Sequence, residues 1–307
     1  MTKKKLVLHI GTHKTGSTTI QNALENQRDH LARKGIWYAR TDREPHIHLA
    51  KHCSTYRAVT QSDEAFDKEF AIMERELAKS GCETLLISEE GFSQLSFAEC
   101  SRFARVGERF DITIICLLRR QDYFLEALWN QYCREGTAKE MINDFITQER
   151  FLRRAEYARI LDFWSTFSTV FTLSFEEVKK RGVVGEFGKL LGVTLKEPDR
   201  SSNVSPDMNL AAMLALLNRF ECEFCEPIII KAFREGNIKY ALGSKLRAEV
   251  LDRFESQNAQ LSAQYGITFD EILPDEPEDS LRYPDPDTTA RAMAQLSMHG
   301  HKKNPSE

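Results

Sequence analysis

A short apolar run, a glycine-rich turn and a helical pattern follow one another without a break in segment 6–21, LVLHIGTHKTGSTTIQ. Residues 6–10 have the length and β-branched content of a buried parallel strand. A helix is expected to begin at Ser17 and to continue through Leu24. The segment therefore predicts a strand, a tight loop and a helix, which is the opening of an α/β fold.

The turn between these two elements has the chemistry of an anion site. Gly11 and Gly16 carry no Cβ, so the backbone between them can approach a ligand closely. Lys14 adds a full positive charge, and a helix N-terminus offers unpaired N–H groups. The first helical turn carries three hydroxyl residues, Ser17, Thr18 and Thr19. We interpret the turn as a phosphate-cradling loop; the alternative is an ordinary strand–helix turn that binds nothing.

The position of the lysine separates two kinds of phosphate loop. The loop of nucleotide hydrolases reads G-x-x-x-x-G-K-[ST], with lysine directly after the second glycine. Here Ser17 follows Gly16, and Lys14 lies two residues before that glycine. The order KTGSTT over 14–19 instead resembles the K-[ST]-G-[ST]-T loop of the sulfotransferases, which use 3′-phosphoadenosine 5′-phosphosulfate (PAPS).

The resemblance implies roles for the residues of this loop. In the sulfotransferases the lysine contacts the bridging oxygen of PAPS, which gives Lys14 a catalytic role, and the hydroxyls and amides after it hold the 5′-phosphate. The loop residues assigned in this way to the co-substrate are His13, Lys14, Thr15, Gly16, Ser17, Thr18 and Thr19. His13 either contacts the co-substrate or shapes the turn. No metal is expected, because the loop lacks the Lys-Ser/Thr pair that organises Mg²⁺ in nucleotide hydrolases.

Further strands and helices alternate along the chain. Strands are predicted over 36–38, 84–88, 111–118 and 169–173. Helices are predicted over 64–79 and about 122–134, near 140–150 and 155–167, up to Gly192, and through most of 206–263. This order implies an α/β fold: a P-loop-type parallel sheet with helices on both faces and a mostly helical C-terminal part.

The same pattern predicts how the chain divides. An α/β core is expected over 1–205, and a helical extension of the same domain over 206–273. The Pro- and Asp-rich stretch that begins the segment 274–307 predicts a linker, followed by a disordered tail.

Two acidic residues, Glu89 and Glu90, follow the predicted strand 84–88. Ligands of such sheets lie outside the carboxyl ends of the strands, so these side chains are candidates for chemistry. A hydroxyl or amine acceptor must lose a proton as it attacks sulfur, and a nearby carboxylate can take it. Sulfotransferases carry their base, His or Glu, just beyond this strand, which favours Glu90 with Glu89 as the alternative. Otherwise both are solvated carboxylates, or one of them caps the next helix.

Two arginines, Arg119 and Arg120, follow the predicted strand 111–118. A guanidinium fork binds two phosphate oxygens at once, and Asp122 is a plausible cap for the helix that follows. LLRRQDYFLEALWNQY resembles the bacterial sulfotransferase segment in which an Arg and a Ser eight residues later bind the 3′-phosphate of PAPS. Arg119 matches this pattern, but Ala127 stands where the family has Ser, and the missing hydroxyl is expected to weaken 3′-phosphate binding.

The remaining resemblance is weaker. Arg200 lies where the family often has a basic loop that closes over the nucleotide. His46 and His48 lie in a His-rich segment that many bacterial relatives share, and they are expected to line the acceptor pocket. A metal site is the other interpretation of these histidines, but the residues around them complete no obvious site.

Charge and cysteine content exclude several classes of function. The net charge of −4 arises from interspersed acidic and basic residues, so we expect neither a nucleic-acid nor a membrane surface. No apolar run reaches the length of a secretory core or of a membrane span. Seven cysteines, an odd number, indicate free thiols in a reducing compartment, and cytoplasm is the predicted location.

The sequence thus predicts a bacterial, PAPS-dependent sulfotransferase that transfers a sulfuryl group to a hydroxyl or amine. Its acceptor is a small molecule or a glycan, and the resemblance favours carbohydrate. Two alternatives stay open. One is a non-catalytic nucleotide-binding member of the fold, which the Ser-to-Ala departure at Ala127 favours; the other is a P-loop kinase or NTPase. The sequence gives no indication of an oligomeric state.

Overall fold

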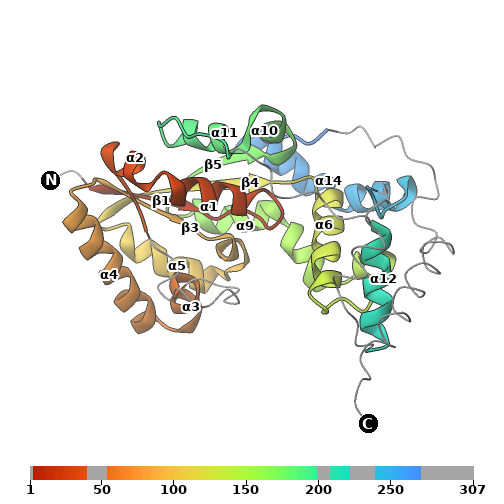
Figure 1. Ribbon diagram of the computed structural model, residues 1–307. Helices are drawn as coiled ribbons and strands as arrows, with labels where there is room; N and C mark the ends of the chain where they lie inside the picture. Colours follow the sequence, from red (N-terminus) through yellow and green to blue (C-terminus); the bar gives the residue numbers. More distant parts are fainter. Residues whose placement is uncertain (1–2, 40–53, 199–207, 222–238, 271–307) are drawn as a thin grey trace, which may run out of the picture. The chain divides into compact units, whose positions relative to one another are not determined.

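The computed structural model describes residues 3–39, 54–198, 208–221 and 239–270 (Figure 1). These residues form two compact units. The first holds the described residues up to Arg120, together with 156–198 and 256–270; the second holds 121–155, 208–221 and 239–255. The domain limits at 205 and 273 stay predictions, and the segment 274–307 lies outside the described residues.

A five-stranded parallel sheet forms the centre of the first unit. Its strands are β1 (Lys4–His9), β2 (Ile36–Tyr38), β3 (Thr84–Ser88), β4 (Phe110–Leu118) and β5 (Thr169–Ser174), in the order β2-β3-β1-β4-β5. All neighbouring strands pair in parallel. Each strand lies within two residues of where the sequence predicts one. The predicted α/β fold with a parallel sheet flanked by helices is confirmed.

Helices α1 (Ser17–Asn26), α2 (Arg28–Arg33), α10 (Phe175–Arg181) and α11 (Val183–Leu190) pack on one face of the sheet (Figure 1). The strands contribute Val7, Leu86 and Ile115 to the buried cluster on this face. The helices contribute Ile20, Ala23, Leu24, Leu31, Val178, Val184 and Phe187. Because side chains alternate along a strand, the buried residues Leu6 and Leu8 point to the opposite face.

That opposite face carries α4 (Asp63–Ser80), α5 (Phe97–Val106) and α9 (Tyr157–Ser165), and α3 (Ser54–Gln61) packs on α4. Phe103 of α5 is the centre of an aromatic cluster, with ring centroids 5.0 Å from Phe66, 5.3 Å from Phe92 and 5.4 Å from Trp164. All four side chains are fully buried. Both faces of the sheet are therefore covered, which explains why its central strands are apolar along nearly their whole length.

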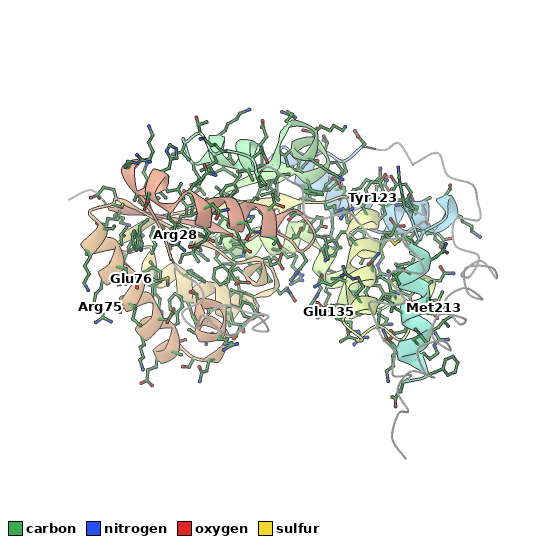
Figure 2. The ribbon with its side chains drawn as sticks, viewed as in Figure 1. Arg28, Arg75, Glu76, Tyr123, Glu135 and Met213 are labelled. Atoms are coloured by element: carbon green, nitrogen blue, oxygen red, sulfur yellow. The ribbon has the colours of Figure 1, made fainter. Side chains whose placement is uncertain are left out.

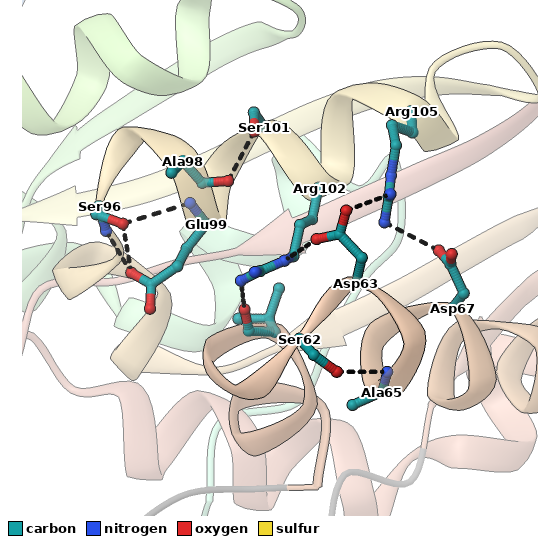
Figure 3. Close-up of polar contacts among 11 residues, drawn as sticks. Ser62, Asp63, Ala65, Asp67, Ser96, Ala98, Glu99, Ser101, Arg102 and Arg105 are labelled. Carbon is teal, nitrogen blue, oxygen red and sulfur yellow. Dashed lines mark hydrogen bonds and ion pairs between the residues drawn. The ribbon is translucent and has the colours of Figure 1, made fainter.

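Ion pairs join α4 to α5 at the surface (Figure 3). Arg102 Nε donates to Asp63 Oδ1 at 2.7 Å, and Arg105 Nη1 donates to Asp63 Oδ2 at 2.8 Å. Arg105 Nη2 also donates to Asp67 Oδ1 at 3.1 Å. These interactions, above all the hydrogen bond from Arg102, lower the pKa of Asp63. Because the pairs are exposed, they fix the approach of the two helices more than they stabilise the fold.

The second unit is helical. It contains α6 (Gln121–Arg134), α7 (Ile142–Phe145), α8 (Glu149–Leu152), η2 (Arg153–Ala155), α12 (Met208–Arg219) and the first part of α14 (Ser244–Tyr265). Figure 2 shows Tyr123 on α6 and Met213 on α12, two helices that pack together. Asn218 Nδ2 ties their ends by donating to the carbonyls of Cys133 at 2.8 Å and Ala138 at 3.0 Å.

A buried charge cluster joins α6 to α14 in this unit. Arg247, 1% exposed, donates to Asp122 Oδ2 at 2.5 Å and to Glu126 Oε1 at 3.0 Å. Glu126 Oε1 also accepts the backbone N–H groups of Ala241 and Leu242 at 2.6 and 2.7 Å. Two rings lie over the guanidinium, 5.0 and 5.2 Å from its carbon: Tyr123 and Tyr240. Asp122 lies inside α6 and is engaged by Arg247, so the interpretation of this residue as a helix cap is wrong.

Some helices differ from the prediction. The helix expected to end near Gly192 is divided into α10 and α11 by Gly182, whose φ of 100° favours glycine. α3, α5 and the 3₁₀ helix η1 (Glu90–Gln94) were not predicted. A sequence signal for α5 existed, because Ser96 and Glu99 form a capping box at its start. Among the described helices, none combines the length and the apolar character needed to cross a membrane.

Candidate active site

The candidate site lies where β1, β3 and β4 end. The strand order reverses at β1, which has β3 on one side and β4 on the other. Such a switch point, outside the carboxyl ends of the strands, is where parallel sheets bind ligands. His9, the last residue of β1, pairs with Ser88 at the end of β3 and with Ile115 of β4. The segments that follow the three strands therefore leave the sheet side by side.

The loop after β1 is fixed by hydrogen bonds of its own residues. Thr12 donates to the carbonyl of Leu117 through its N–H at 3.2 Å and through its hydroxyl at 3.0 Å. Thr15, fully buried, donates its hydroxyl to the carbonyl of Thr12 at 2.5 Å. Lys14 and Gly16 have φ values of 65° and 81°. Left-handed backbone is unusual for a lysine, and such conformations gather at functional sites.

The start of α1 has polar groups that would suit an anionic oxygen. The N-cap residue of this helix is Gly16. Because glycine has no side chain, no side chain caps the first N–H groups of the helix. Within the described part of the chain, the buried atom His9 Nε2 has no hydrogen-bond partner, and the Ser17 hydroxyl, also buried, lies close enough to Glu90 to lower the pKa of that carboxyl. A Cβ on Gly11 would lie 2.8 Å from Ser17 Oγ and 3.0 Å from His9 Nε2. The backbone at Gly11 thus passes close to both side chains, next to the N-terminus of α1, where N–H groups can attract an anion.

The two acidic residues after β3 have different surroundings. Glu89 is buried; its Oε1 accepts the N–H of Gly91 at 2.9 Å and caps η1, and its own N–H donates to the carbonyl of His9 at 2.9 Å. Glu90 is 33% exposed, and its Oε1 lies 3.0 Å from Nδ1 of His13. Glu89 therefore has a role in the local fold, whereas Glu90 turns toward the loop after β1.

The charge of Glu90 depends on the loop residues. Burial raises its pKa, but this effect is outweighed by the hydrogen bond from His13, by the charges of His13 and Lys14, and by the hydroxyl of Ser17. The net effect lowers the pKa of Glu90 below its ordinary value of 4.5. Glu90 is therefore ionised at neutral pH and can accept a proton.

His9 lies beneath this site and stays neutral. Its Nδ1 lies 2.7 Å from Ser88 Oγ, and its side chain is fully buried. Burial lowers its pKa to about 4, although the charge of Glu90 acts in the opposite direction. His9 is thus a neutral, buried polar side chain that links the end of β1 to the end of β3 through its contact with Ser88.

Arg119 and Arg120, after β4, point to different partners. Arg119 Nη1 donates to the carbonyl of Lys14 at 3.2 Å, its Nε lies 3.8 Å from Glu176 Oε1, and its guanidinium carbon lies 5.5 Å from the ring centre of Phe175. Arg120, 2% exposed, donates to the carbonyl of Asp270 at 2.7 Å. Arg119 therefore reaches the loop after β1, whereas Arg120 anchors the segment that follows α14.

The other predicted residues are placed as follows. Thr18 is exposed and Thr19 half-buried in the first turn of α1. Ala127 is half-buried on α6 of the second unit. Arg200, His46 and His48 lie outside the described residues, and their roles stay predictions. The first unit thus brings Lys14, Ser17, Glu90 and Arg119 into one neighbourhood.

Three residues of this neighbourhood were missed by sequence reasoning: His9, Gln94 and Glu176. Glu176 lies at the start of α10, where an acidic residue is common in the first turn of any helix. His9 directly follows three apolar residues of a buried strand, and this position gives no indication of a polar role. Gln94 lies in η1, and a five-residue 3₁₀ helix leaves no periodic signal. Among described residues, no group of three or more His, Cys, Asp or Glu side chains is arranged to hold a metal ion.

Comparison with known proteins gave structural neighbours only. No family model and no curated sequence matches the chain. A sulfotransferase from Alicyclobacillus acidocaldarius is 15% identical with a TM-score of 0.45, covering 76% of this chain and 100% of its own. The sulfotransferase domain of the curacin biosynthetic pathway is 14% identical with a TM-score of 0.36, covering 83% and 98%. A structure from the PezAT toxin–antitoxin system of Streptococcus pneumoniae is 12% identical with a TM-score of 0.32, covering 84% and 87%. These similarities are too low to carry an activity over to this chain.

Proposed function

We propose that this chain is a PAPS-dependent sulfotransferase that transfers a sulfuryl group to a hydroxyl or amine of an acceptor. The observation that carries the proposal is the loop after β1, where Lys14 and the start of α1 lie between an ionised carboxylate, Glu90, and a guanidinium, Arg119. Anion-binding groups on one side and a proton acceptor on the other are what sulfuryl transfer to a hydroxyl or amine needs.

In this proposal the loop residues bind and orient the sulfated nucleotide. The unpaired N–H groups of α1 and the hydroxyl of Ser17 hold the 5′-phosphate. Lys14 balances the negative charge that develops on the bridging oxygen. Thr15 supports the loop from inside through its hydrogen bond to Thr12. The fixed loop means that little reorganisation is needed during the reaction.

Glu90 is the proposed base, and Arg119 the proposed ligand of the 3′-phosphate. The low pKa of Glu90 keeps it ionised and ready to accept a proton at neutral pH. Arg119 would exchange its long contact with Glu176, 3.8 Å, for two phosphate oxygens. In the sulfotransferase pattern the residue at position 127 is a serine, and the hydroxyl that Ala127 lacks is expected to weaken 3′-phosphate binding by roughly 1–2 kcal/mol.

The remaining assignments follow the resemblance and are also part of the proposal. Arg200 would close over the nucleotide, and His46 and His48 would line the pocket of a carbohydrate or other small acceptor. The cytoplasm of a bacterium is the proposed location. The buried, free thiols of Cys82, Cys100, Cys116 and Cys133 agree with a reducing compartment.

Calorimetric titration tests the proposal directly. We expect the wild-type chain to bind adenosine 3′,5′-bisphosphate at micromolar concentration and AMP much more weakly, and we expect Arg119→Ala to lose the difference. AMP is the matched control, because it lacks the 3′-phosphate. A preference for Mg²⁺-ATP would assign the chain to the kinase or NTPase class instead.

A second candidate is a non-catalytic nucleotide-binding protein, which the alanine at position 127 favours. Bisphosphate binding without sulfuryl transfer to a panel of carbohydrate, phenol and amine acceptors would support this candidate.

A further inference from the structure

The ring of His13 bridges the two ends of η1. Its Nδ1 lies 3.0 Å from Glu90 Oε1, and its Nε2 is in contact with the amide nitrogen of Gln94. Glu90 and Gln94 are the first and last residues of η1, so the ring connects the loop after β1 to the segment after β3. The His13 side chain is only 15% exposed, which restricts its movement.

The contact with Gln94 is compatible with two protonation states of the ring, and His13 donates to Glu90 in both. With the amide nitrogen of Gln94 donating, Nε2 of His13 is the acceptor and the ring carries its proton on Nδ1. Nδ1–H then donates to Glu90 Oε1. If the amide of Gln94 turns to present its oxygen, the same two partners can hold the ring with both nitrogens protonated. In both arrangements His13 donates to Glu90.

The backbone of η1 is fixed independently of His13. Glu89 Oε1 accepts the N–H of Gly91 at 2.9 Å, and Ser93 Oγ donates to the carbonyl of Glu90 at 2.8 Å. The freedom that is left to Glu90 is that of its side chain, and the contact with His13 removes it. A carboxylate held at one oxygen presents the other in a defined direction.

We propose that His13 is a positioning residue: it holds Oε1 of Glu90, with Gln94 bracing the ring, so that Oε2 takes the proton of the acceptor. The inference rests on the proposed function. The acceptor atom bonds to sulfur, the bridging oxygen leaves with the electron pair of the broken bond, and the acceptor's proton passes to Oε2. His13 touches neither the acceptor nor the transferred group.

The groups that influence Glu90 most lie in the loop after β1. His13 and Lys14 act on it as titratable or charged groups, the hydroxyl of Ser17 adds to them, and His9 of β1 is influenced by its charge. The hydrogen bond from His13 is the largest influence that lowers the pKa of Glu90. Removal of His13 leaves burial opposed mainly by Lys14, so the pKa of Glu90 rises.

Two variants of the full chain test this role. His13→Ala removes both ring contacts, whereas His13→Asn keeps an amide N–H close to the position of Nδ1. The pKa of Glu90 is followed by ¹³C NMR of labelled glutamate carboxyls, with Glu90→Gln to assign the signal. We expect a higher pKa in His13→Ala, a return toward the wild-type value in His13→Asn, and an acid limb of the kcat profile that moves to higher pH in His13→Ala. We also expect kcat to fall by roughly tenfold, part of the contribution of a general base.

Binding of adenosine 3′,5′-bisphosphate separates positioning from co-substrate contact. Bisphosphate affinity within twofold of wild type in His13→Ala, together with the shifted Glu90 titration, supports the inference. A Glu90 pKa that is the same in all three proteins overturns it, and so does loss of bisphosphate binding without a shift. If the wild-type chain binds no bisphosphate, the proposed function fails, but the carboxyl titration still decides whether His13 holds Glu90.

Discussion

The guanidinium of Arg119 donates a hydrogen bond to the main-chain oxygen of Lys14, 3.2 Å away, across the ends of two neighbouring strands. Lys14 has left-handed backbone, φ 65°, and this bond is one of the contacts that hold it there. The two cations proposed to bind opposite ends of one ligand are therefore joined through the backbone of the loop. A change at Arg119 is expected to affect both charge and loop shape.

Replacing Lys14 by alanine is expected to abolish sulfuryl transfer while leaving the fold intact. Removal of a single group that stabilises developing charge costs about 100- to 1,000-fold in kcat. Alanine accepts the left-handed backbone no worse than lysine does, so thermal unfolding should not change. Lys68→Ala, at an exposed position of α4, is the matched control for loss of one positive charge. Normal turnover in a folded Lys14→Ala protein would contradict the proposed role.

Arg119 and Glu176 are expected to have opposite effects on bisphosphate affinity. Arg119→Ala removes charged hydrogen bonds and should weaken adenosine 3′,5′-bisphosphate binding by roughly 10- to 100-fold. Glu176→Gln removes the carboxylate that lies 3.8 Å from Arg119 Nε, so binding should tighten. Calorimetry of the two variants checks both signs. Arg119→Lys keeps the charge but loses the planar fork, and only partial recovery is expected.

His9 should make the first unit less stable in mild acid. Its pKa is about 4 in the folded chain and 6.5 without the fold, so the unfolded chain binds the proton first. The free energy of unfolding therefore falls as the pH drops from 6.5 toward 4, by roughly 3 kcal/mol in all. Hydrogen exchange of β1 and β3 amides at pH 7 and pH 5 measures this loss. In His9→Asn, which can still reach Ser88, most of the difference should disappear.

Arg247 should be one of the residues on which the second unit depends most. Arg247→Met leaves the buried carboxylates of Asp122 and Glu126 without their cation, and the loss of one partner from a buried ion pair costs about 3–5 kcal/mol. Urea unfolding of the full chain, followed by hydrogen exchange of α6, gives the change in stability.

The matched control lies on the same helix. Arg253 pairs with Glu149 at 3.1 Å, but its side chain is 53% exposed, so Arg253→Ala should cost less than about 1 kcal/mol. If both arginine variants lose the same free energy of unfolding, the buried cluster contributes no more to stability than the exposed pair.

The strands and the loop could be predicted from the sequence because their signals are local. An apolar run that ends in Gly-x-x-x-x-Gly defines β1 and its loop with no knowledge of what packs around them. The choice of Glu90 over Glu89 as base stays a prediction; in the structure Glu89 caps η1 while Glu90 faces the loop. The capping role of one glutamate was an open alternative in the sequence, and only the backbone of η1 separates the two.

What the sequence could not give are contacts between residues far apart in the chain. The pairs Arg119–Glu176 and Asp122–Arg247 are separated by 57 and 125 positions, and neither has a spacing that could reveal it. The division of the helix at Gly182 rests on backbone with φ 100°, a conformation that favours glycine. Such constraints exist only once the chain has folded.

Because β1 lies between β3 and β4, the two sides of the site carry opposite charges. The segment after β3 brings a carboxylate, Glu90, to one side of the loop, and the segment after β4 brings a guanidinium, Arg119, to the other. In the proposed function the sulfated nucleotide carries phosphate at both its 5′ and its 3′ end, so each phosphate has to lie on a cation and away from Glu90. Two like charges about 4 Å apart repel by roughly 4 kcal/mol near a protein surface. Strand order thus sets which side of the loop carries the guanidinium and which carries the carboxylate.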